Sequence, residues 1–484
     1  MPSAVLPRHA PAGAPPSAPA PHHRHGPVLA LMSSCVVLAV ALVAAVNLAL
    51  PKLAGSGLHP THAELVWIVD AYVLAFACLL IPAGALGDRR GRKGALLAGL
   101  AVFAAGCLLA ALAPAPEPLI AARALSGAGA ALIMPATLSL ALQTAPPDRK
   151  AHAVAIWTGA TGAAGMVGNL GGGLVLQYLP WQGLFWVSLP LALLLLALVA
   201  RLAPRTAPSR TAGPADPLGT ALLVLGSVAL VAGIVEGPEH GWSSAPVLGS
   251  FAAAAVLLAA FAGYSAKAGD PLIDPRVFRI PKLRAGTLGV AATFIGLFAL
   301  FFVNAQYLQY AKGYSPALTG LATAPVAVGM IVVARLSPWA VRRWGGRPVV
   351  ALGLAAVTAG LALLSLLTAG TPYLAYAGVL LVMAMGMGLS MPPLSTAILG
   401  SLPAERAGLG SGLNSAAREF GSALGIAVMG TVLAGRTLTD GMSAGFRLVA
   451  GAVAVLGAVT VLWFREPAGA PEATGSAGAA GAVR

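Results

Sequence analysis

Long apolar runs, separated by short polar or Pro/Gly segments, dominate this sequence. A helix that crosses the hydrocarbon core of a bilayer needs about 20 apolar residues. About fourteen runs meet this length. They lie near residues 28–50, 64–86, 94–113, 117–142, 152–174, 183–202, 217–236, 246–264, 285–308, 317–340, 347–368, 373–398, 408–434 and 445–464. We therefore predict an all-α polytopic membrane protein with about fourteen transmembrane helices.

The composition excludes a soluble domain of this size. Of the 484 residues, 58% are hydrophobic and 9% are charged, whereas a soluble domain carries about 25% charged residues. The chain cannot cover itself with polar surface, so we expect lipid to be its solvent. The cysteines Cys35, Cys78 and Cys107 lie inside apolar runs without the spacing of a disulfide or a metal site. We expect no metal and no cofactor.

The distribution of basic residues predicts the orientation in the membrane. With the N-terminus in the cytoplasm, the outside segments hold only Lys52, Lys312, Arg436 and Arg447. The inside segments hold roughly five times as many Lys and Arg, which predicts that both termini are cytoplasmic. This bias also explains the net charge of +14. No basic face of a soluble domain remains, so we expect no nucleic-acid partner.

Composition divides the chain into five parts. Residues 1–27, rich in Pro, Ala and His, and residues 467–484, rich in Gly and Ala, are predicted to be disordered cytoplasmic tails. Between them we predict a six-helix bundle over 28–202, a linker with two extra transmembrane helices over 203–284, and a second six-helix bundle over 285–466.

The segment Gly84–Lys93 is unusually charged for this chain. Five of its ten residues carry charge, and it stands between two apolar runs. A degraded copy, Ala340–Arg347, follows the tenth run but lacks an acidic residue. Two related loops indicate an internal repeat, as in transporters built from pseudo-symmetric bundles.

Several motifs, in order along the chain, resemble the fourteen-helix drug:H⁺ antiporter branch of the major facilitator superfamily. Gly84–Lys93 is similar to the family's loop between the second and third helices, and Arg123–Gly129 is similar to its fourth-helix Arg-x-x-x-Gly-x-Gly pattern. Other matching stretches are Val46–Pro51, Trp67–Tyr72, Gly241–Ser243, Pro271–Asp274, Gln306–Gln309, Gly313–Pro316 and Arg418–Gly421. The resemblance implies proton-coupled export of amphipathic drugs or antibiotics by alternating access. It places the protein in a bacterial plasma membrane, where we expect a monomer.

Three positions depart from the family pattern. Leu42 stands where the branch commonly has an Asp in the first helix, Asn169 replaces the Pro of the fifth-helix Gly-Pro motif, and Trp181-Gln182-Gly183 replaces Trp-Arg-Trp. Two alternatives therefore stay open. One is a proton symporter or facilitator of a small metabolite on the same fold. The other is a membrane-embedded enzyme, although no metal-ligand, nucleophile or phosphate-loop arrangement stands out.

Asp70 and Glu419 are the two acidic residues deep within the apolar runs. A charge at the middle of the membrane costs at least about 2.5–3.5 kcal/mol, and a carboxyl group avoids this cost by binding a proton. Each is therefore a candidate proton carrier, and Arg123 is a candidate for driving proton release. The structural alternatives are a helix-start carboxylate near the outer water for Asp70, an ion pair with another span for Glu419, and a cross-link between helices for Arg123.

The resemblance also implies a gate and an antiporter-type helix. The gate residues are Gly84, Asp88, Arg89, Gly91 and Arg92. They would hold the two bundles together on the cytoplasmic side, with Asp88 at the N-terminus of the thirteenth helix, where the helix dipole favours a carboxylate. The alternative is that the basic residues only set the topology.

The fifth apolar run is rich in glycine. The antiporter-type positions in it are Gly168, Asn169, Gly172 and Gly173. Small residues let helices approach closely and slide. Ordinary tight packing is the alternative.

Aromatic and amide side chains provide candidates for a substrate pocket. They are Asn47, Trp67, Tyr72, Phe301, Phe302, Gln306, Tyr307 and Gln309. Such a pocket suits amphipathic organic molecules, and Trp67 or Tyr307 offers a cation–π contact. The alternative for each is a place in the core or against lipid.

Overall fold

The computed structural model describes residues 25–146, 149–204, 216–269, 271–273, 275–402 and 407–464, and every regular element within these ranges is helical. The α-helices are α1 (His25–Ala54), α2 (His62–Arg90), α3 (Arg92–Ala111), α4 (Pro116–Thr144), α5 (Lys150–Tyr178), α6 (Gly183–Leu202), α7 (Pro217–His240), α8 (Ala245–Lys267), α9 (Pro281–Gln306), α10 (Pro316–Ala322), α11 (Ala324–Trp344), α12 (Gly346–Leu364), α13 (Tyr373–Leu399), α14 (Ala407–Leu433) and α15 (Leu438–Trp463). A 3₁₀ helix, η3 (Pro275–Arg279), precedes α9, and a π-helix, η4 (Tyr307–Ala311), follows it.

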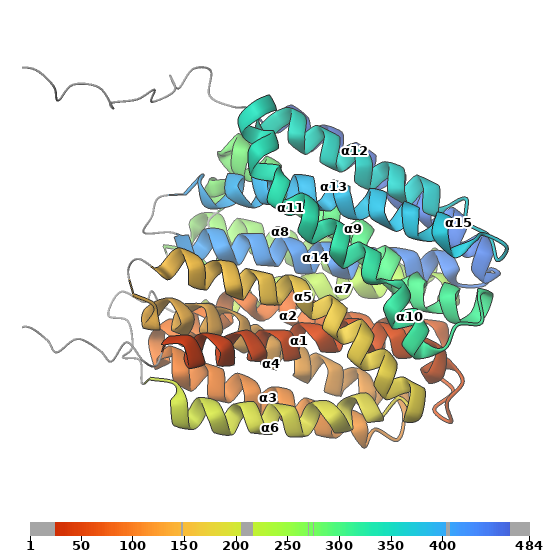
Figure 1. Ribbon diagram of the computed structural model, residues 1–484, viewed down its shortest axis with the longest axis horizontal. Coiled ribbons are helices and arrows are strands. Elements are labelled where there is room, and N and C mark those ends of the chain that lie inside the picture. Colours follow the sequence, from red (N-terminus) through yellow and green to blue (C-terminus); the bar gives the residue numbers. More distant parts are fainter. Residues whose placement is uncertain are drawn as a thin grey trace, which may run out of the picture.

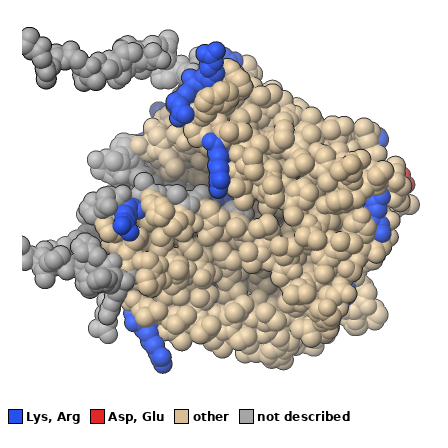
Figure 2. Space-filling view, in the orientation of Figure 1, with Lys and Arg blue, Asp and Glu red and all other residues tan. Residues whose placement is uncertain are grey.

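The predicted all-α membrane fold is confirmed. Thirteen segments of the described chain are long and apolar enough to cross a membrane, with α10 and α11 counted together as one. The 29-residue helix α5 packs along α1 and is a fourteenth long helix. Basic side chains lie toward the two ends of the face in Figure 2, and a wide region without charge separates them. This is the surface that a bilayer requires.

Local sequence explains where several helices begin. Thr61 forms a capping box with Glu64, in which each side chain accepts a hydrogen bond from the other residue's backbone N–H. Asp216 caps α7 by accepting from the N–H of Gly219 at 2.7 Å and also accepts from the N–H of Leu272 at 2.8 Å. This second bond ties the start of α7 to the segment that leads into α9.

The structure corrects three predicted boundaries. The predicted span 317–340 is broken at Thr323, because Pro325 at the start of α11 has no N–H to continue the ladder. The predicted loop Gly84–Lys93 is helical except at Gly91. The last span begins at Leu438, seven residues before the predicted start, so Arg447 lies within α15 and not in an outside loop.

Single glycines make two equivalent sharp turns. Gly91, with φ 91°, joins α2 to α3, and Gly345, with φ 84°, joins α11 to α12. Only glycine adopts this backbone region without strain. The two segments that resemble each other in sequence therefore make the same turn in the structure.

The long helices form two groups with the same packing pairs. In the first group α1 packs on α5, α4 packs on α2 and α3, and α3 packs on α6. In the second group α9 packs on α14, α13 packs on α11 and α12, and α12 packs on α15. We call them the N-terminal group (α1–α6) and the C-terminal group (α9–α15); Figure 1 shows them in the lower and upper halves of the view.

Helix α7 lies against both groups. It packs on α2 of the N-terminal group and on α14 of the C-terminal group, while α8 packs mainly on α7. Glu236 accepts a hydrogen bond from the indole Nε1 of Trp67 at 3.1 Å, and Glu239 accepts from the N–H of Ala63 at 2.9 Å. Thr431 donates to the carbonyl of Ile234 at 2.7 Å. The inserted helix pair is thus attached at the line where the two groups meet.

Helix α1 begins and α15 ends on the same side of the molecule (Figure 1). We call this the terminal side and the opposite side the far side. On the far side α1 and α7 end, α2 and α15 begin, and the π-helix η4 leads into α10.

Candidate functional site

A cavity lies between the two helix groups. Its walls come from α1, α2 and α5 on one side and from α9, α11, α14 and Thr323, just before α11, on the other. Its volume is about 120 Å³, which corresponds to a few water molecules at about 30 Å³ each. Organic ligands occupy about 300–1,000 Å³. In this conformation the cavity is therefore too small for such a ligand, and the groups must move apart to admit one.

Aromatic side chains form much of the cavity wall. Phe294, Phe298 and Phe301 of α9 line it together with Phe76 of α2. The three residues of α9 follow one another at four and three positions, so they share one helix face. The ring centroids of Phe294 and Phe298 are 6.2 Å apart, and those of Phe298 and Phe301 are 5.8 Å apart. The cavity therefore offers a continuous aromatic surface.

Glu419 and Arg418 of α14 also line the cavity. Glu419 is 8% exposed. Within the described part of the chain, its carboxyl group makes no salt bridge and no side-chain hydrogen bond. The guanidinium Cζ of Arg418 lies 4.8 Å from the ring centroid of Phe294. A carboxyl group free of direct partners in a nearly dry cavity has the environment that we expect for a proton-binding group.

Asp70 is enclosed at the contact between α2 and α14. It is fully buried, and neither carboxyl oxygen has a hydrogen-bond partner. Val66, one turn before it, packs on Gly430 of α14, and Ile81, three turns after it, packs on Gly412 of the same helix. Since whole turns return to the same face, Asp70 also faces α14. Full burial excludes the alternative of a carboxylate near the outer water in this conformation.

Arg123 connects three helices of the N-terminal group. Its Nε donates to the carbonyl of Ile68 at 3.0 Å, and its Cζ lies 4.5 Å from the ring centroid of Tyr72. The hydroxyl of Tyr72 in turn donates to the carbonyl of Ala39 on α1 at 2.7 Å. These contacts agree with the cross-link alternative for Arg123. Its Nη1 and Nη2 are buried without partners, so it keeps donors for an anionic group.

Three comparisons with known proteins bear on this site. The sequence profile of the family described as Major Facilitator Superfamily matches residues 32–426 and, in a second match, residues 287–483. The chain is 36% identical to the "Cephamycin export protein CmcT" of Amycolatopsis lactamdurans over 83% of this chain and 84% of that protein.

The chain belongs to the major facilitator superfamily.

Two further relatives agree with this assignment. The "Multidrug efflux pump LfrA" of Mycolicibacterium smegmatis is 33% identical over 84% of this chain and 79% of that protein. A crystal structure of the POT family transporter PepTSo superposes with a TM-score of 0.68 at 14% identity, covering 91% of this chain and 97% of that one. The resemblance that the motifs indicate is thereby confirmed, and the protein is a multi-pass membrane transporter. The enzyme alternative is not retained.

The predicted gate residues of this superfamily member lie where α2 turns into α3. Arg92 Nη1 donates to the carbonyl of Gly84 at 3.3 Å, which places a cation at the C-terminal end of α2. Lys93 Nζ donates to the carbonyls of Ala200 and Ala203 at 2.8 and 2.7 Å. These contacts stay within the N-terminal group. Arg89 lies in the last turn of α2, and the predicted contact of the Asp88 side chain with the thirteenth span lies outside the described residues.

The predicted antiporter-type positions divide between two contacts of α5. A β-carbon placed on Gly168 would lie 2.1 Å from the carbonyl oxygen of Ala41, and one on Gly172 would lie 2.7 Å from the β-carbon of Ala45. These two glycines therefore pack on α1. Gly173 instead approaches the other helix group, since its β-carbon would lie 2.6 Å from the carbonyl oxygen of Pro316 in α10.

Asn169 belongs to both the cavity and the contact between the groups. Its side chain lines the cavity, while its carbonyl oxygen would lie 2.2 Å from a β-carbon on Gly320 of α10. The residue that departs from the family's Gly-Pro pattern is thus one of those that α5 contributes to the cavity wall. Helix α10 ends at the break next to Thr323, which also lines the cavity. Broken helices of this kind mark the binding sites of many transporters.

Of the predicted pocket residues, only Phe301 lines the cavity in this conformation. Trp67 and Tyr72 make the bonds to Glu236 and Ala39 given above, and Phe302 is 1% exposed. The amides of Asn47 and Gln306 donate to backbone carbonyls of their own helices at 3.0 Å. Their roles in binding stay predictions for a conformation in which the groups have moved.

The last two predicted pocket residues lie on the far side. Tyr307 donates to the carbonyl of Thr368 at 2.8 Å. The amide of Gln309 donates to the carbonyl of Leu48 at 3.0 Å, across the line between the groups. Next to it, the hydroxyl of Tyr310 donates to the carbonyl of Pro51, also at 3.0 Å. The far-side ends of the two groups are therefore joined in this conformation.

Several cavity residues were missed in the sequence. They are Phe294, Phe298, Arg418, Thr323, Met166 and Met330. The spacing of Phe294, Phe298 and Phe301 is a helical-face signal that the sequence contains. The sequence does not show whether that helix face points toward the cavity, the protein core or the lipid.

Gly320→Ala should favour a conformation that is open on the far side. The added β-carbon collides with the carbonyl of Asn169 only while α5 and α10 are in contact. A bias of about 1.4 kcal/mol changes the ratio of two conformations about tenfold. With Ala327→Cys as a reporter in the cavity wall, we expect faster labelling by a membrane-impermeant thiol reagent added from the far side.

The matched control is Gly171→Ala, because a β-carbon on Gly171 meets no atom within 4 Å. It should leave the labelling rate unchanged. An unchanged rate in Gly320→Ala as well, in protein with a normal melting temperature, would show that this contact does not set the conformation.

Proposed function

We propose that this transporter exports amphipathic organic molecules, including antibiotics, in exchange for protons. We further propose that it resides in a bacterial plasma membrane as a monomer, with the terminal side in the cytoplasm. Two relatives named for export and efflux, CmcT and LfrA, support this direction of transport. The excess of Lys and Arg in the inside segments supports the orientation.

The observation that carries the proposal is the composition of the cavity between the helix groups. An aromatic surface, one carboxyl group and one guanidinium group meet there at Phe294, Glu419 and Arg418. Aromatic faces accept the apolar part of a substrate, the two charged side chains accept its polar part, and the carboxyl group can also bind a proton. A site of this kind suits molecules with both apolar and ionisable parts.

We propose that transport follows alternating access between the two groups. The groups would act as the six-helix bundles 28–202 and 285–466, with 203–284 as the inserted pair. Closing on the far side uses the contacts of α5 with α10 and of η4 with α1. Closing on the terminal side would use the gate residues around Asp88. Proton binding at Glu419 or Asp70 would favour one arrangement over the other, because it removes a charge from the contact between the groups.

A resistance and accumulation screen in an efflux-deficient bacterial host tests this proposal. Cells that express the protein should accumulate less of at least one amphipathic compound, and an uncoupler should remove the difference. In vesicles, addition of that compound should move protons, and Asp70→Asn should stop this movement. Proton movement that persists in both Asp70→Asn and Glu419→Gln would remove these carboxyl groups from the mechanism.

The position of Asn169 in the cavity wall leaves one alternative function open, and the same transport assays test it. Because an amide replaces the usual proline beside the cavity, a proton symporter or facilitator of a small metabolite stays possible. Uptake that an inward proton gradient stimulates, without export of any amphipathic compound, would favour this alternative over export.

A further inference from the structure

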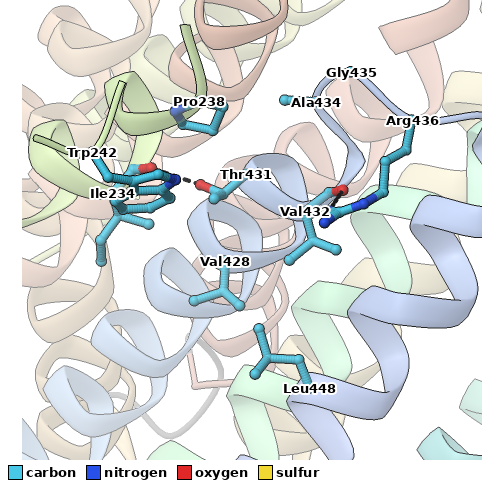
Figure 3. Close-up of a pocket in the computed structure, with 10 residues that line it drawn as sticks. All are labelled: Ile234, Pro238, Trp242, Val428, Thr431, Val432, Ala434, Gly435, Arg436 and Leu448. Carbon is cyan, nitrogen blue, oxygen red and sulfur yellow. Dashed lines mark hydrogen bonds between the residues drawn. The ribbon is translucent and has the colours of Figure 1, made fainter. Parts of the chain in front are cut away.

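A second and larger cavity lies on the far side, between α7, α14 and α15 (Figure 3). Its volume is about 630 Å³. The cavity has apolar walls and a polar rim. The walls include Ile234, Val428, Val432 and Leu448, and the rim includes Trp242 and Arg436.

This groove opens at the level where three spans end. Helix α7 ends at His240, α14 ends at Leu433 and α15 begins at Leu438. Val428 and Leu448 lie further in, at about 8 and 15 Å from the ends of their helices at 1.5 Å per residue. The groove therefore runs from the membrane–water boundary into the depth of the hydrocarbon layer.

The rim carries a cation, Arg436, that has unused hydrogen-bond donors. Arg436 is exposed, and its Nη1 donates to the carbonyl of Val432 at 2.5 Å. It has no ion pair in the described part of the chain. A guanidinium has five N–H donors, so most of its donors stay available. Trp242, at the opposite end of the groove in Figure 3, is 52% exposed and is the residue type that favours the headgroup level of a bilayer.

A second arginine lies nearby in the membrane zone. Arg447 is exposed on α15, about 14 Å from the start of the helix, and directly precedes the wall residue Leu448. The described residues provide no partner for it. Helical side chains lean toward the N-terminus, which for α15 is the far side. A cation at this depth requires an anionic partner, and none of the described residues supplies one.

The neighbouring acidic groups are engaged elsewhere. Glu236 binds Trp67 and pairs with His240, whose Nδ1 lies 3.3 Å from its Oε2. Asp440 accepts a hydrogen bond from the hydroxyl of Thr437 at 2.6 Å. The two arginines are therefore the groups with unused capacity around this groove.

We propose that the groove binds an anionic phospholipid of the far-side leaflet. The phosphate would lie at Arg436, the indole of Trp242 at the glycerol level, and an acyl chain along Val428, Val432 and Leu448. Because the groove touches both α7 and α14, a bound lipid would fill the corner between the inserted pair and the C-terminal group. This proposal is independent of the identity of the exported substrate.

Native mass spectrometry of the purified full-length protein tests the site. We expect phosphatidylglycerol to bind more tightly than phosphatidylcholine. Arg436→Gln should weaken phosphatidylglycerol binding about fivefold, the equivalent of about 1 kcal/mol for one basic residue near the headgroups. The matched control, Arg343→Gln, removes an exposed charge at the end of α11 on the terminal side and should leave this binding unchanged.

Two further arms identify the ligand. Val432→Trp fills the groove and should reduce binding of phosphatidylglycerol while Arg436 is intact. Inorganic phosphate at millimolar concentration should not displace the lipid; displacement without any effect of Val432→Trp would identify a site for free anions and overturn the proposal. Equal binding of both lipids, or wild-type binding in Arg436→Gln, would also overturn it.

Discussion

Glu419→Gln should reduce substrate-driven proton movement in reconstituted vesicles to the level of vesicles without protein. Glutamine keeps the size and the hydrogen-bonding oxygen of the side chain but cannot bind and release a proton. In the described structure Glu419 has no direct partner, so the substitution breaks no bond. We therefore expect normal expression and a normal melting temperature together with the loss of coupling.

The same variant separates the two interpretations of Glu419. If the residue were half of a structural ion pair with another span, glutamine would leave a buried cation without its partner, which costs about 3–5 kcal/mol. The protein would then unfold at lower temperature. A loss of coupling without a loss of stability supports proton transfer, and a loss of both supports the ion pair.

Glu117→Gln is the matched control for this experiment. Glu117 is an exposed carboxylate in the first turn of α4, away from the cavity. Its replacement removes the same charge and should leave proton movement unchanged. Wild-type proton movement in Glu419→Gln would contradict the proposed role, whatever the outcome for Glu117.

The sequence was sufficient for the fold because the bilayer imposes one length on every span. Runs of about 20 apolar residues are readable one at a time, without knowledge of their neighbours. Even the diluted runs that became α7 and α8 were recognisable. The break at Thr323 was less visible, because Pro325 is tolerated at the start of a helix as well as at a kink.

The pocket was harder to predict because it depends on how each helix is rotated. Trp67 is aromatic and lies near Asp70, yet it turns toward Glu236, which is 169 residues away in sequence. Phe301 lines the cavity while its neighbour Phe302 is in the core. Adjacent residues of a helix point about 100° apart. Because lipid and the protein core are both apolar, hydrophobic periodicity does not show which of the two residues faces the cavity.

The contact between α1 and α5 also depends on how each helix is rotated, and its contribution to stability can be measured. Gly168 and Gly172 are four residues apart and pack on Ala41 and Ala45, which are also four apart. Membrane helices gain no hydrophobic stabilisation from contact with each other, so close approach of small residues supplies much of their packing energy. Each of these glycines therefore fixes the distance between the two helices, whether or not α5 takes part in antiport.

Gly168→Ala should consequently be among the most destabilising single substitutions in this helix. The new β-carbon would lie 2.1 Å from the carbonyl oxygen of Ala41, and backbone cannot rotate away as a side chain does. Overpacking of this kind costs about 1–3 kcal/mol and occasionally more. We expect a lower melting temperature and reduced transport. Gly171→Ala, one turn further on the same helix and without neighbours, should gain up to about 1 kcal/mol from helix propensity. Equal melting temperatures for the two variants would mean that α1 and α5 are not in contact in the membrane. The packing of α5 within the N-terminal group would then have to be reconsidered.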